Sequence, residues 1–223
     1  MGTALDDLPP EFGVFPLTGA LLLPGGKLPL NIFEKRYLRM IDDALSTGRV
    51  IGMIQPDESR ADTPSGPALY RVGCLGRVSS FSETDDGRYL ITLSGVMRFG
   101  VQVELEVYRG YRRVRADLAR FQSDLDDGAA APIDRDGLLG ALRAYFQAHG
   151  FDANWDAIDE MPDGPLVNTL AMVCPFEPPE KQALLEAGTD VARAETLLTL
   201  LTMGAHTSDF GGTRDGQPSR RAT

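Results

Sequence analysis

Hydrophobic and polar positions in the first half of the chain follow the period of β-strands. Apolar residues alternate with polar ones along Tyr89–Val103, and the same two-residue period returns at Val114, Ala116 and Leu118. Because successive side chains of a strand point to opposite faces, this alternation predicts strands with one buried face. Shorter apolar runs at 12–17, 20–23, 27–30 and 50–54 predict further extended segments.

The strongest pairing signal is a hairpin between Tyr70–Phe81 and Arg88–Val103. These segments flank Asp85-Asp86-Gly87, and glycine accepts the positive φ that a tight turn requires. Gly110-Tyr111 then turns the chain back into another strand. Many short strands joined by close turns predict a small barrel or a pair of curled sheets.

One helix interrupts the strands. Asn31 with Glu34 three residues later has the spacing of a capping box, which predicts a helix start. A stripe at helical spacing follows, and Gly48 is expected to end the helix. The stripe consists of Tyr37, Met40, Ile41, Ala44 and Leu45.

The pattern changes in the second half. Residues 122–133 carry no strand pattern and resemble a linker, after which apolar residues recur at helical spacing. Asp134 is expected to cap a helix ending near Gly150, and Pro178 to begin a later one. The predicted class is α+β: a β-rich unit at 1–121 with one early helix, a linker at 122–133, a helical unit at 134–204 and a flexible tail at 205–223.

Composition and charge narrow the functional classes. The 223 residues are 43% hydrophobic and 24% charged, as in an ordinary globular protein. The net charge of −10 makes nucleic acid an unlikely partner, because phosphate binding needs clustered basic residues. Arg109–Arg115 is the only dense basic run, and its spacing equally fits the exposed face of a strand. No apolar run spans a bilayer and the N-terminus lacks signal-peptide features, so we expect a cytoplasmic protein without membrane contact.

Residues that carry chemistry are sparse. Cys74, Cys174, His149 and His206 form no metal-binding motif, and in a reducing compartment we expect two buried thiols, although the spacing does not exclude a disulfide. Gly25-Gly26-Lys27 lacks the spacing and the following hydroxyl of a phosphate loop. Acidic pairs such as Asp42-Asp43 fit solvated positions better than a site. The sequence therefore predicts no catalytic residue, no cofactor and no metal.

Three groups of residues resemble one family, the Lon protease N-terminal substrate-binding domain of the peptidase S16 group. The first is Phe15-Pro16-Leu17, the apolar run to Gly25, and Leu28-Pro-Leu-Asn-Ile-Phe-Glu-x-Arg-Tyr37. The second is Gly73–Val78 followed by Leu93-Ser-Gly-Val-Met-Arg-Phe99, and the third is Glu180–Glu186 followed by 191–201. The resemblance covers about residues 12–204.

The resemblance implies a PUA-like β-barrel followed by a helical bundle. It implies a bacterial, non-catalytic module that recognises proteins or peptides, because the chain ends before the motor and the Ser-Lys peptidase of Lon. We expect unfolded or partner proteins as ligands, and by analogy with the family's other members the expected role is that of an adaptor or quality-control factor.

An apolar surface at exposed loops and at the seam between barrel and bundle is the expected binding site. Its predicted members are Leu21, Leu22, Leu23 and Phe33, while Asn31, Glu34, Arg36 and Tyr37 are expected to be structural. These apolar residues would equally fill the core. Two alternatives stay open: an RNA-binding PUA-like module, and a small-molecule-binding or enzymatic domain. The oligomeric state is not predicted.

Overall fold

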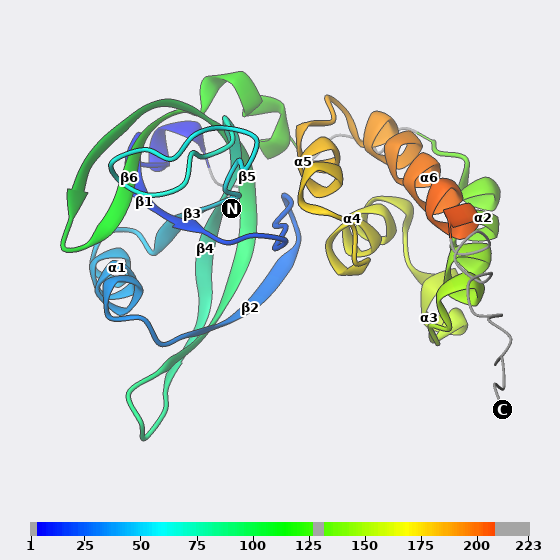
Figure 1. The fold of residues 1–223 in the computed structure, drawn as a ribbon, viewed down its shortest axis with the longest axis horizontal. Helices are drawn as coiled ribbons and strands as arrows, with labels where there is room; N and C mark the ends of the chain where they lie inside the picture. Colours follow the sequence, from blue (N-terminus) through cyan, green and yellow to red (C-terminus); the bar gives the residue numbers. More distant parts are fainter. Residues whose placement is uncertain (1–3, 127–131, 208–223) are drawn as a thin grey trace, which may run out of the picture.

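The computed structural model describes residues 4–126 and 132–207. Strands occupy the first part of the chain and helices the second, in an arrangement of two regions side by side (Figure 1). We call residues 4–126 the sheet region and residues 132–207 the helical region. The strands are β1 (Glu11–Pro16), β2 (Lys27–Ile32), β3 (Val50–Ile54), β4 (Val72–Glu83), β5 (Tyr89–Tyr108) and β6 (Tyr111–Asp117).

The six strands form one mixed sheet in the order β2-β5-β4-β3-β1-β6. β1 and β3 are parallel, and the remaining pairs are antiparallel. β5 has 20 residues and pairs with β4 through its first part and with β6 through its second part, so the sheet curls back on itself. The predicted α+β class is therefore confirmed.

Turn chemistry explains the two hairpins of the sheet. Gly87 has φ of 79° between β4 and β5, where the sequence predicts a hairpin. Arg109 and Gly110, with φ of 51° and 93°, turn β5 into β6. An arginine in this left-handed conformation carries strain that the following glycine does not.

The helix α1 (Lys35–Ser46) begins later than the capping pattern predicts. Asn31 belongs to β2 and pairs with Leu90, so its side chain does not cap the helix. Glu34 is the residue before the helix but makes no capping hydrogen bond. The capping-box prediction is wrong because the ladder between β2 and β5 extends through Ile32.

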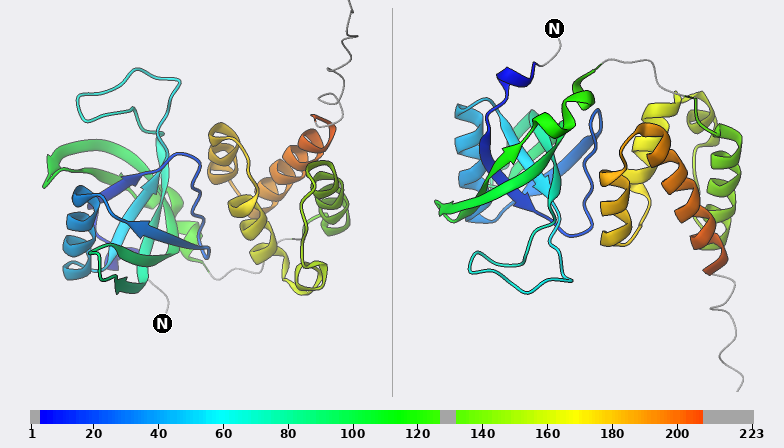
Figure 2. Two further views of the ribbon diagram at one scale, coloured as in Figure 1. Left: turned by 60° about the horizontal axis from the view of Figure 1, so that its bottom comes forward. Right: turned by 90° about the horizontal axis from the view of Figure 1, so that it is seen from above.

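The helical region contains five α-helices among its described residues. They are α2 (Arg135–His149), α3 (Trp155–Glu160), α4 (Asp163–Val173), α5 (Pro178–Glu186) and α6 (Asp190–Thr207). As predicted, the Asp134 carboxylate accepts a hydrogen bond from the Gly137 amide at 3.0 Å, and Gly150 ends α2 with φ of 67°. Figure 2 shows these helices gathered on one side of the sheet region. α3 has no counterpart in the sequence prediction.

The connection between the regions differs in detail from the predicted linker. The 3-10 helix η2 (Ala119–Leu125) continues past residue 122 and buries Phe121. Residues 127–131 of the predicted linker and 208–223 of the predicted tail lie outside the described residues, while 205–207 belong to α6. None of the described helices has the length and hydropathy that crossing a bilayer requires.

Candidate binding site at the seam between sheet and helices

The loop between β1 and β2 forms one part of the contact between the two regions, which we call the seam. This loop carries Leu21, Leu22 and Leu23, which are 2%, 1% and 0% exposed. A Cβ on Gly76 would lie 2.8 Å from the Leu22 side chain, and one on Gly95 would lie 2.0 Å from the Leu23 carbonyl oxygen. All three leucines lie in the core, with Leu22 and Leu23 packed against glycines, and they do not form the exposed surface that the sequence suggests.

Hydrogen bonds join the loop and β3 to the helices. The Pro24 carbonyl accepts from Asn168 Nδ2 of α4 at 3.0 Å, and the Gly19 carbonyl accepts from Lys181 Nζ of α5 at 2.7 Å. Gln55, just after β3, donates to the Pro178 carbonyl at 3.1 Å. Gln182 of α5 donates to the Val72 carbonyl at 3.1 Å. Each bond joins a sheet-region residue to a helical-region residue, so the seam has a defined geometry.

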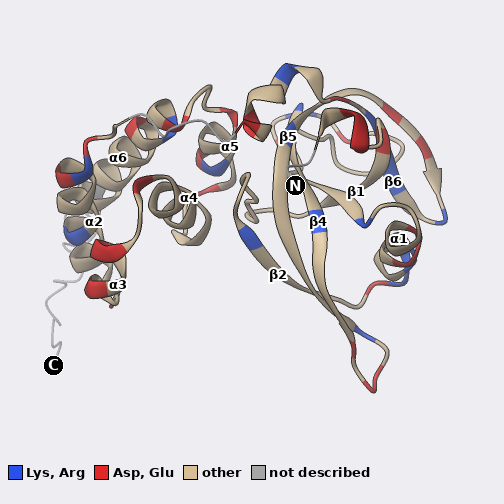
Figure 3. Ribbon diagram, turned by 180° about the vertical axis from the view of Figure 1, so that it is seen from behind, with Lys and Arg blue, Asp and Glu red and all other residues tan. Residues whose placement is uncertain are grey.

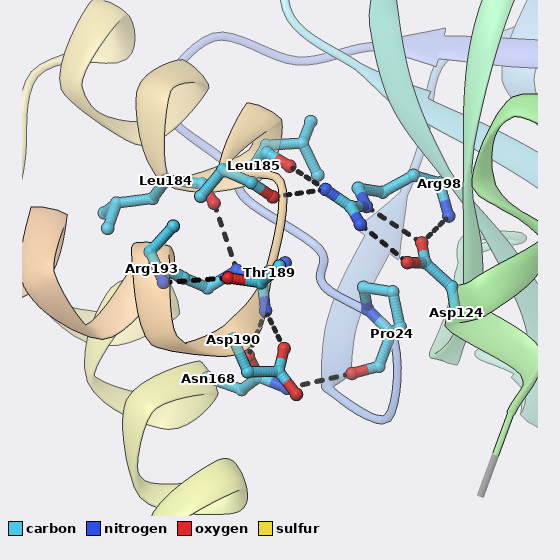
Figure 4. A network of polar contacts seen from close by, with 11 residues as sticks. Pro24, Arg98, Asp124, Asn168, Leu184, Leu185, Thr189, Asp190 and Arg193 are labelled. Atoms are coloured by element: carbon cyan, nitrogen blue, oxygen red, sulfur yellow. Dashed lines mark hydrogen bonds and ion pairs between the residues drawn. The ribbon is translucent and has the colours of Figure 1, made fainter. Parts of the chain in front are cut away.

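Arg98 of β5 is the central polar residue of the seam (Figure 4). Its guanidinium forms a bidentate pair with Asp124 of η2, with Nε–Oδ2 and Nη2–Oδ1 distances of 2.9 and 2.7 Å. Asp124 also accepts from the Arg98 amide at 2.9 Å. Nη1 reaches the Leu185 and Ala187 carbonyls at the end of α5, at 3.3 and 2.5 Å. Both charged side chains are nearly excluded from solvent, so each depends on the other for compensation.

A second buried arginine, Arg193 of α6, holds the helical side of the same seam. Its Nε donates to the Leu184 carbonyl at 3.1 Å, and Nη1 contacts Asp190 Oδ1 at 2.6 Å and Asn168 Oδ1 at 3.4 Å. Asn168 in turn donates to Pro24, so α4, α6 and the β1–β2 loop share one network (Figure 4). Burial lowers the pKa of Arg193 below its ordinary value, and the neighbouring Asp190 opposes that shift.

Burial also shifts the pKa values of other titratable groups near the seam. Burial lowers the pKa of Lys181 and raises the pKa of Cys174 to about 11. The pKa of the Cys74 thiol is raised still further, with burial as the largest cause. Both cysteines are buried free thiols in this structure. A neutral thiol is a poor nucleophile, so neither side chain is activated for covalent chemistry.

An apolar groove of about 490 Å³ opens on one side of the Pro24–Asn168 hydrogen bond. On the loop side, the glycines leave mainly backbone atoms to line the groove. On the α4 side, apolar side chains line it, and the Val173 side chain is 65% exposed. Gly26 allows the loop to pack closely against α4, because a Cβ at this position would lie 2.5 Å from Met172 Sδ. Lys27 supplies the single charged lining residue. We call this feature the seam groove; its main lining residues are Gly25, Gly26, Lys27, Pro165, Met172 and Val173.

A polar cavity of about 500 Å³ adjoins the seam groove, and Gly25 and Asn168 line both. Arg98, Asp124, Asp190 and Arg193 line it, and the ion pairs described above already satisfy these four charges. Among the described residues, no cluster of three or more His, Cys, Asp or Glu side chains is placed to hold a metal ion. Asp126 also lines the cavity and takes part in none of the ion pairs of the described residues, while the four paired charges hold the two sides of the seam together.

The remaining predicted residues lie at the start of α1, away from the seam groove. Phe33 is 66% exposed, as a surface residue should be, whereas Tyr37 is 6% exposed and packs edge-on against Phe15 at 4.3 Å between ring centroids. Glu34 pairs with Arg36, whose Nε lies 2.9 Å from Oε2, and the Arg36 guanidinium stacks over Tyr37. The four leucine and phenylalanine residues predicted as one surface are thus divided between core and solvent.

Comparison with known proteins places this architecture in a family. The family model described as the ATP-dependent protease La (LON) substrate-binding domain matches residues 11–203. The chain belongs to the Lon substrate-binding domain family. The match spans the sheet, the seam and all five helices of the helical region.

Two curated relatives of this Lon-family chain are named as Lon proteases. It is 25% identical over 198 residues to the Lon protease of Anaeromyxobacter dehalogenans, covering 89% of this chain and 22% of that protein. It is 24% identical over 198 residues to Lon protease 2 of Myxococcus xanthus, with the same coverage of 89% and 22%. The chain thus spans about a fifth of the length of these Lon relatives, as the 22% coverage shows.

Two solved structures share the Lon-domain fold. A Lon N-terminal domain protein from Xanthomonas campestris aligns with a TM-score of 0.60 and 21% identity, covering 85% of this chain and 97% of that one. The N-terminal domain of Mycobacterium avium complex Lon protease aligns with a TM-score of 0.59 and 15% identity, covering 86% and 98%. At these identities the likeness describes the fold alone.

Sequence reasoning missed the polar part of the seam in this Lon-family chain. Arg98 falls in the apolar stretch Val96-Met97-Arg98-Phe99, and Arg193 interrupts the apolar stripe of α6. A lone arginine within a buried strand or stripe is a signal for a buried ion pair, because an unpaired charge there is too costly. The sequence pattern does not identify Asp124 as the partner, since that residue lies in the predicted linker.

Proposed function

We propose that this chain is a non-catalytic protein- and peptide-recognition module whose seam groove binds apolar segments of unfolded or partner proteins. The observation that carries the proposal is an open apolar groove between the two halves of a Lon substrate-binding domain. Recognition of protein substrates is what the family description implies. The groove supplies the physical means for such recognition in this chain.

The composition of the groove suits an extended peptide. Its loop wall contains Gly25, where a Cβ would meet nothing within 4 Å, so a ligand backbone can approach closely; the space at Gly26 is filled by Met172. Its other wall presents Met172 and Val173, and methionine adapts to apolar partners of different shape. The exposed Thr169 adds a polar group for a main-chain hydrogen bond. A surface of this kind favours apolar side chains with little demand for a particular sequence.

The absence of catalysis is part of the proposal. Both thiols have raised pKa values, and the buried arginines are paired with carboxylates or carbonyls. These features favour binding over bond cleavage. Peptidase and ATPase assays on the purified chain should show no activity above a boiled control, and activity abolished by one point substitution would contradict the proposal.

Charge distribution argues against the RNA-binding alternative. The arginines of the basic run are each matched by a carboxylate: Arg109 by Asp43, Arg112 by Glu104, and both Arg113 and Arg115 by Glu11. In the view of Figure 3, basic and acidic residues are interspersed over both regions. A salt-dependent RNA complex would require a basic surface of unpaired side chains.

Fluorescence anisotropy with a labelled, permanently unfolded protein tests the groove. Reduced and carboxymethylated α-lactalbumin is a suitable probe, because it exposes apolar segments without folding. Val173→Asp places a charge on the apolar wall, and we expect it to weaken binding by at least about tenfold, since one desolvated charge costs more than 1.4 kcal/mol.

A matched control is Val107→Asp, which introduces the same charge at a comparably exposed valine on the β5–β6 hairpin. It should leave binding unchanged. Phe33→Asp tests the surface predicted from the sequence: a loss of binding there, with Val173→Asp silent, would move the site to the start of α1. Leu23 is unsuitable for such a test, because it is fully buried and a charge would unfold the chain.

An adaptor or quality-control role for the same surface is a further step of this proposal. Crosslinking in lysate, followed by capture of the wild-type chain and of Val173→Asp, should recover client proteins only with the wild type. Equal recovery with both proteins would contradict a role for the seam groove.

A further inference from the structure

The hairpin of β4 and β5 extends beyond the rest of the sheet and carries β2 on one side (Figure 1). β2 pairs with β5 from Lys27 to Ile32, while β4 loses its partner β3 after the Arg77–Val50 pair. The result is a three-stranded arm, β2-β5-β4, with two outer edges. An unpaired edge presents backbone N–H and C=O groups to which another strand can add.

The β2 edge is protected by its sequence. The Gly95 amide donates to the Gly26 carbonyl, so the alternation of an antiparallel ladder points the backbone groups of Lys27, Pro29 and Asn31 away from β5. Pro29 has no N–H to offer, and Lys27 places a charge at the edge. Proline and lysine are the residues by which proteins prevent pairing at an edge.

The β4 edge has neither protection. The Thr84 amide donates to the Arg88 carbonyl, so Thr84 and Ser82 face β5, and the backbone groups of Phe81 and Glu83 face away from it. Residues 79–83 are exposed and contain no proline and no lysine. Phe81 is 38% exposed and stacks edge-on against Tyr89 at 4.9 Å between ring centroids. This edge is short, and among the described residues no strand pairs with its outer side beyond Arg77.

Charges of opposite sign lie at the two ends of this edge. The turn beyond Glu83 carries Asp85 and Asp86; Asp86 pairs with Arg88 of the same turn, so Asp85 and Glu83 supply the excess negative charge. At the other end, Arg49 Nε donates to the Val78 carbonyl and Arg77 Nη1 donates to the Gly48 carbonyl. Neither arginine takes part in an ion pair within the described part of the chain. Two copies placed antiparallel would bring the acidic turn of each beside the arginines of the other.

We propose that the β4 edge at residues 79–83 is a self-association surface that pairs antiparallel with the same edge of a second copy. Phe81 of one copy lies opposite Glu83 of the other. The outward N–H and C=O groups of these two residues then form hydrogen bonds with each other. Ser82 then lies opposite Ser82 of the second copy on the two-fold axis. This arrangement is an isologous interface, so it closes at two copies and does not propagate.

The interface concerns a different surface from the seam groove and does not depend on the proposed function. Because five residues from each copy bury little area, the dimer is weak and forms only at high protein concentration. Sedimentation velocity over a concentration series should show a single reversible shift from monomer to dimer. A chain that stays monomeric at every concentration overturns the proposal.

Charge substitution at the axis tests the register. Ser82 is exposed, so Ser82→Lys and Ser82→Glu leave the fold intact. Each variant alone should lose the dimer, because two like charges meet at the axis. An equimolar mixture of the two should form a heterodimer at least as readily as the wild-type chain. Dimers in either single variant, or no recovery on mixing, overturn the proposed pairing.

A proline scan tests the backbone bonds. Phe81→Pro removes an outward N–H and leaves the ladder with β5 in place, so it should weaken the dimer by at least about tenfold. Phe81→Ala keeps the N–H and should weaken it less. Asn31→Pro makes the matched change on the β2 edge and should have no effect. Circular dichroism verifies folding of each variant, and an effect from Asn31→Pro equal to that from Phe81→Pro overturns the choice of edge.

Discussion

At the scale of single residues, the seam depends on charges that the sequence hides among apolar neighbours. Arg98 and Asp124 are both nearly excluded from solvent, and three hydrogen bonds join them. A buried pair of this kind adds little net stability over an apolar pair, but removing one partner leaves an uncompensated charge. The pair therefore specifies how η2 and α5 meet β5.

Loss of Arg98 should be costly. Arg98→Met leaves Asp124 buried without its partner, and we expect the free energy of unfolding to fall by about 3–5 kcal/mol. Urea denaturation followed by circular dichroism measures the change. Arg143→Ala breaks the exposed pair with Asp159 and should cost less than about 1 kcal/mol. Equal effects from the two substitutions would contradict the buried-pair account.

The two thiols give a prediction about reactivity and pH. Burial raises the pKa of Cys174 from 9.0 to about 11 and raises the pKa of Cys74 as well, so both thiols stay protonated in the folded chain at pH 8. Alkylation at pH 8 should be slow until urea unfolds the protein. Because the folded pKa lies above the unfolded one, this contribution to stability is complete below pH 9 and declines as the pH rises toward 11. Rapid alkylation of the folded chain would refute the burial of the thiols.

At the scale of elements, periodicity and turn residues predicted most of the structure. The β4–β5 hairpin follows from alternation around Asp85-Asp86-Gly87, and α2 follows from Asp134 at one end and Gly150 at the other. The start of α1 was mispredicted, because a tertiary pairing of Asn31 with Leu90 overrides a local capping pattern. The short α3 has no sequence signal of sufficient length. The burial of Leu21–Leu23 could not be predicted from the local sequence, because an apolar loop has the same sequence pattern whether it is buried in a core or exposed on a surface.

The two residues that the sequence proposes as helix caps should differ in how much their loss destabilises the chain. Asp134→Ala removes the hydrogen bond to the Gly137 amide and should lower the free energy of unfolding by about 1 kcal/mol. Asn31→Ala should have a smaller effect, because Asn31 is an exposed residue of an edge strand and caps no helix. Thermal and urea denaturation of both variants measure the difference. A larger loss for Asn31→Ala would restore the capping interpretation.

At the scale of the whole molecule, the seam gives the chain its candidate binding site. The sequence and its family resemblance predicted the succession of a β-rich and a helical part, but not the contacts between them, which join residues more than 80 positions apart. The division into a unit at 1–121 and a unit at 134–204 as separate domains stays a prediction. The hydrogen bonds of the seam argue that the two parts hold a fixed relative position, and this fixes the shape of the proposed binding groove.

Hydrogen–deuterium exchange of the chain with and without carboxymethylated α-lactalbumin tests the central claim most directly. Binding in the seam groove should slow exchange in the loop around Gly25–Lys27 and in α4, and leave the β5–β6 hairpin unchanged. Protection confined to the start of α1, or no protection at a concentration of probe that saturates binding, would contradict recognition at the seam.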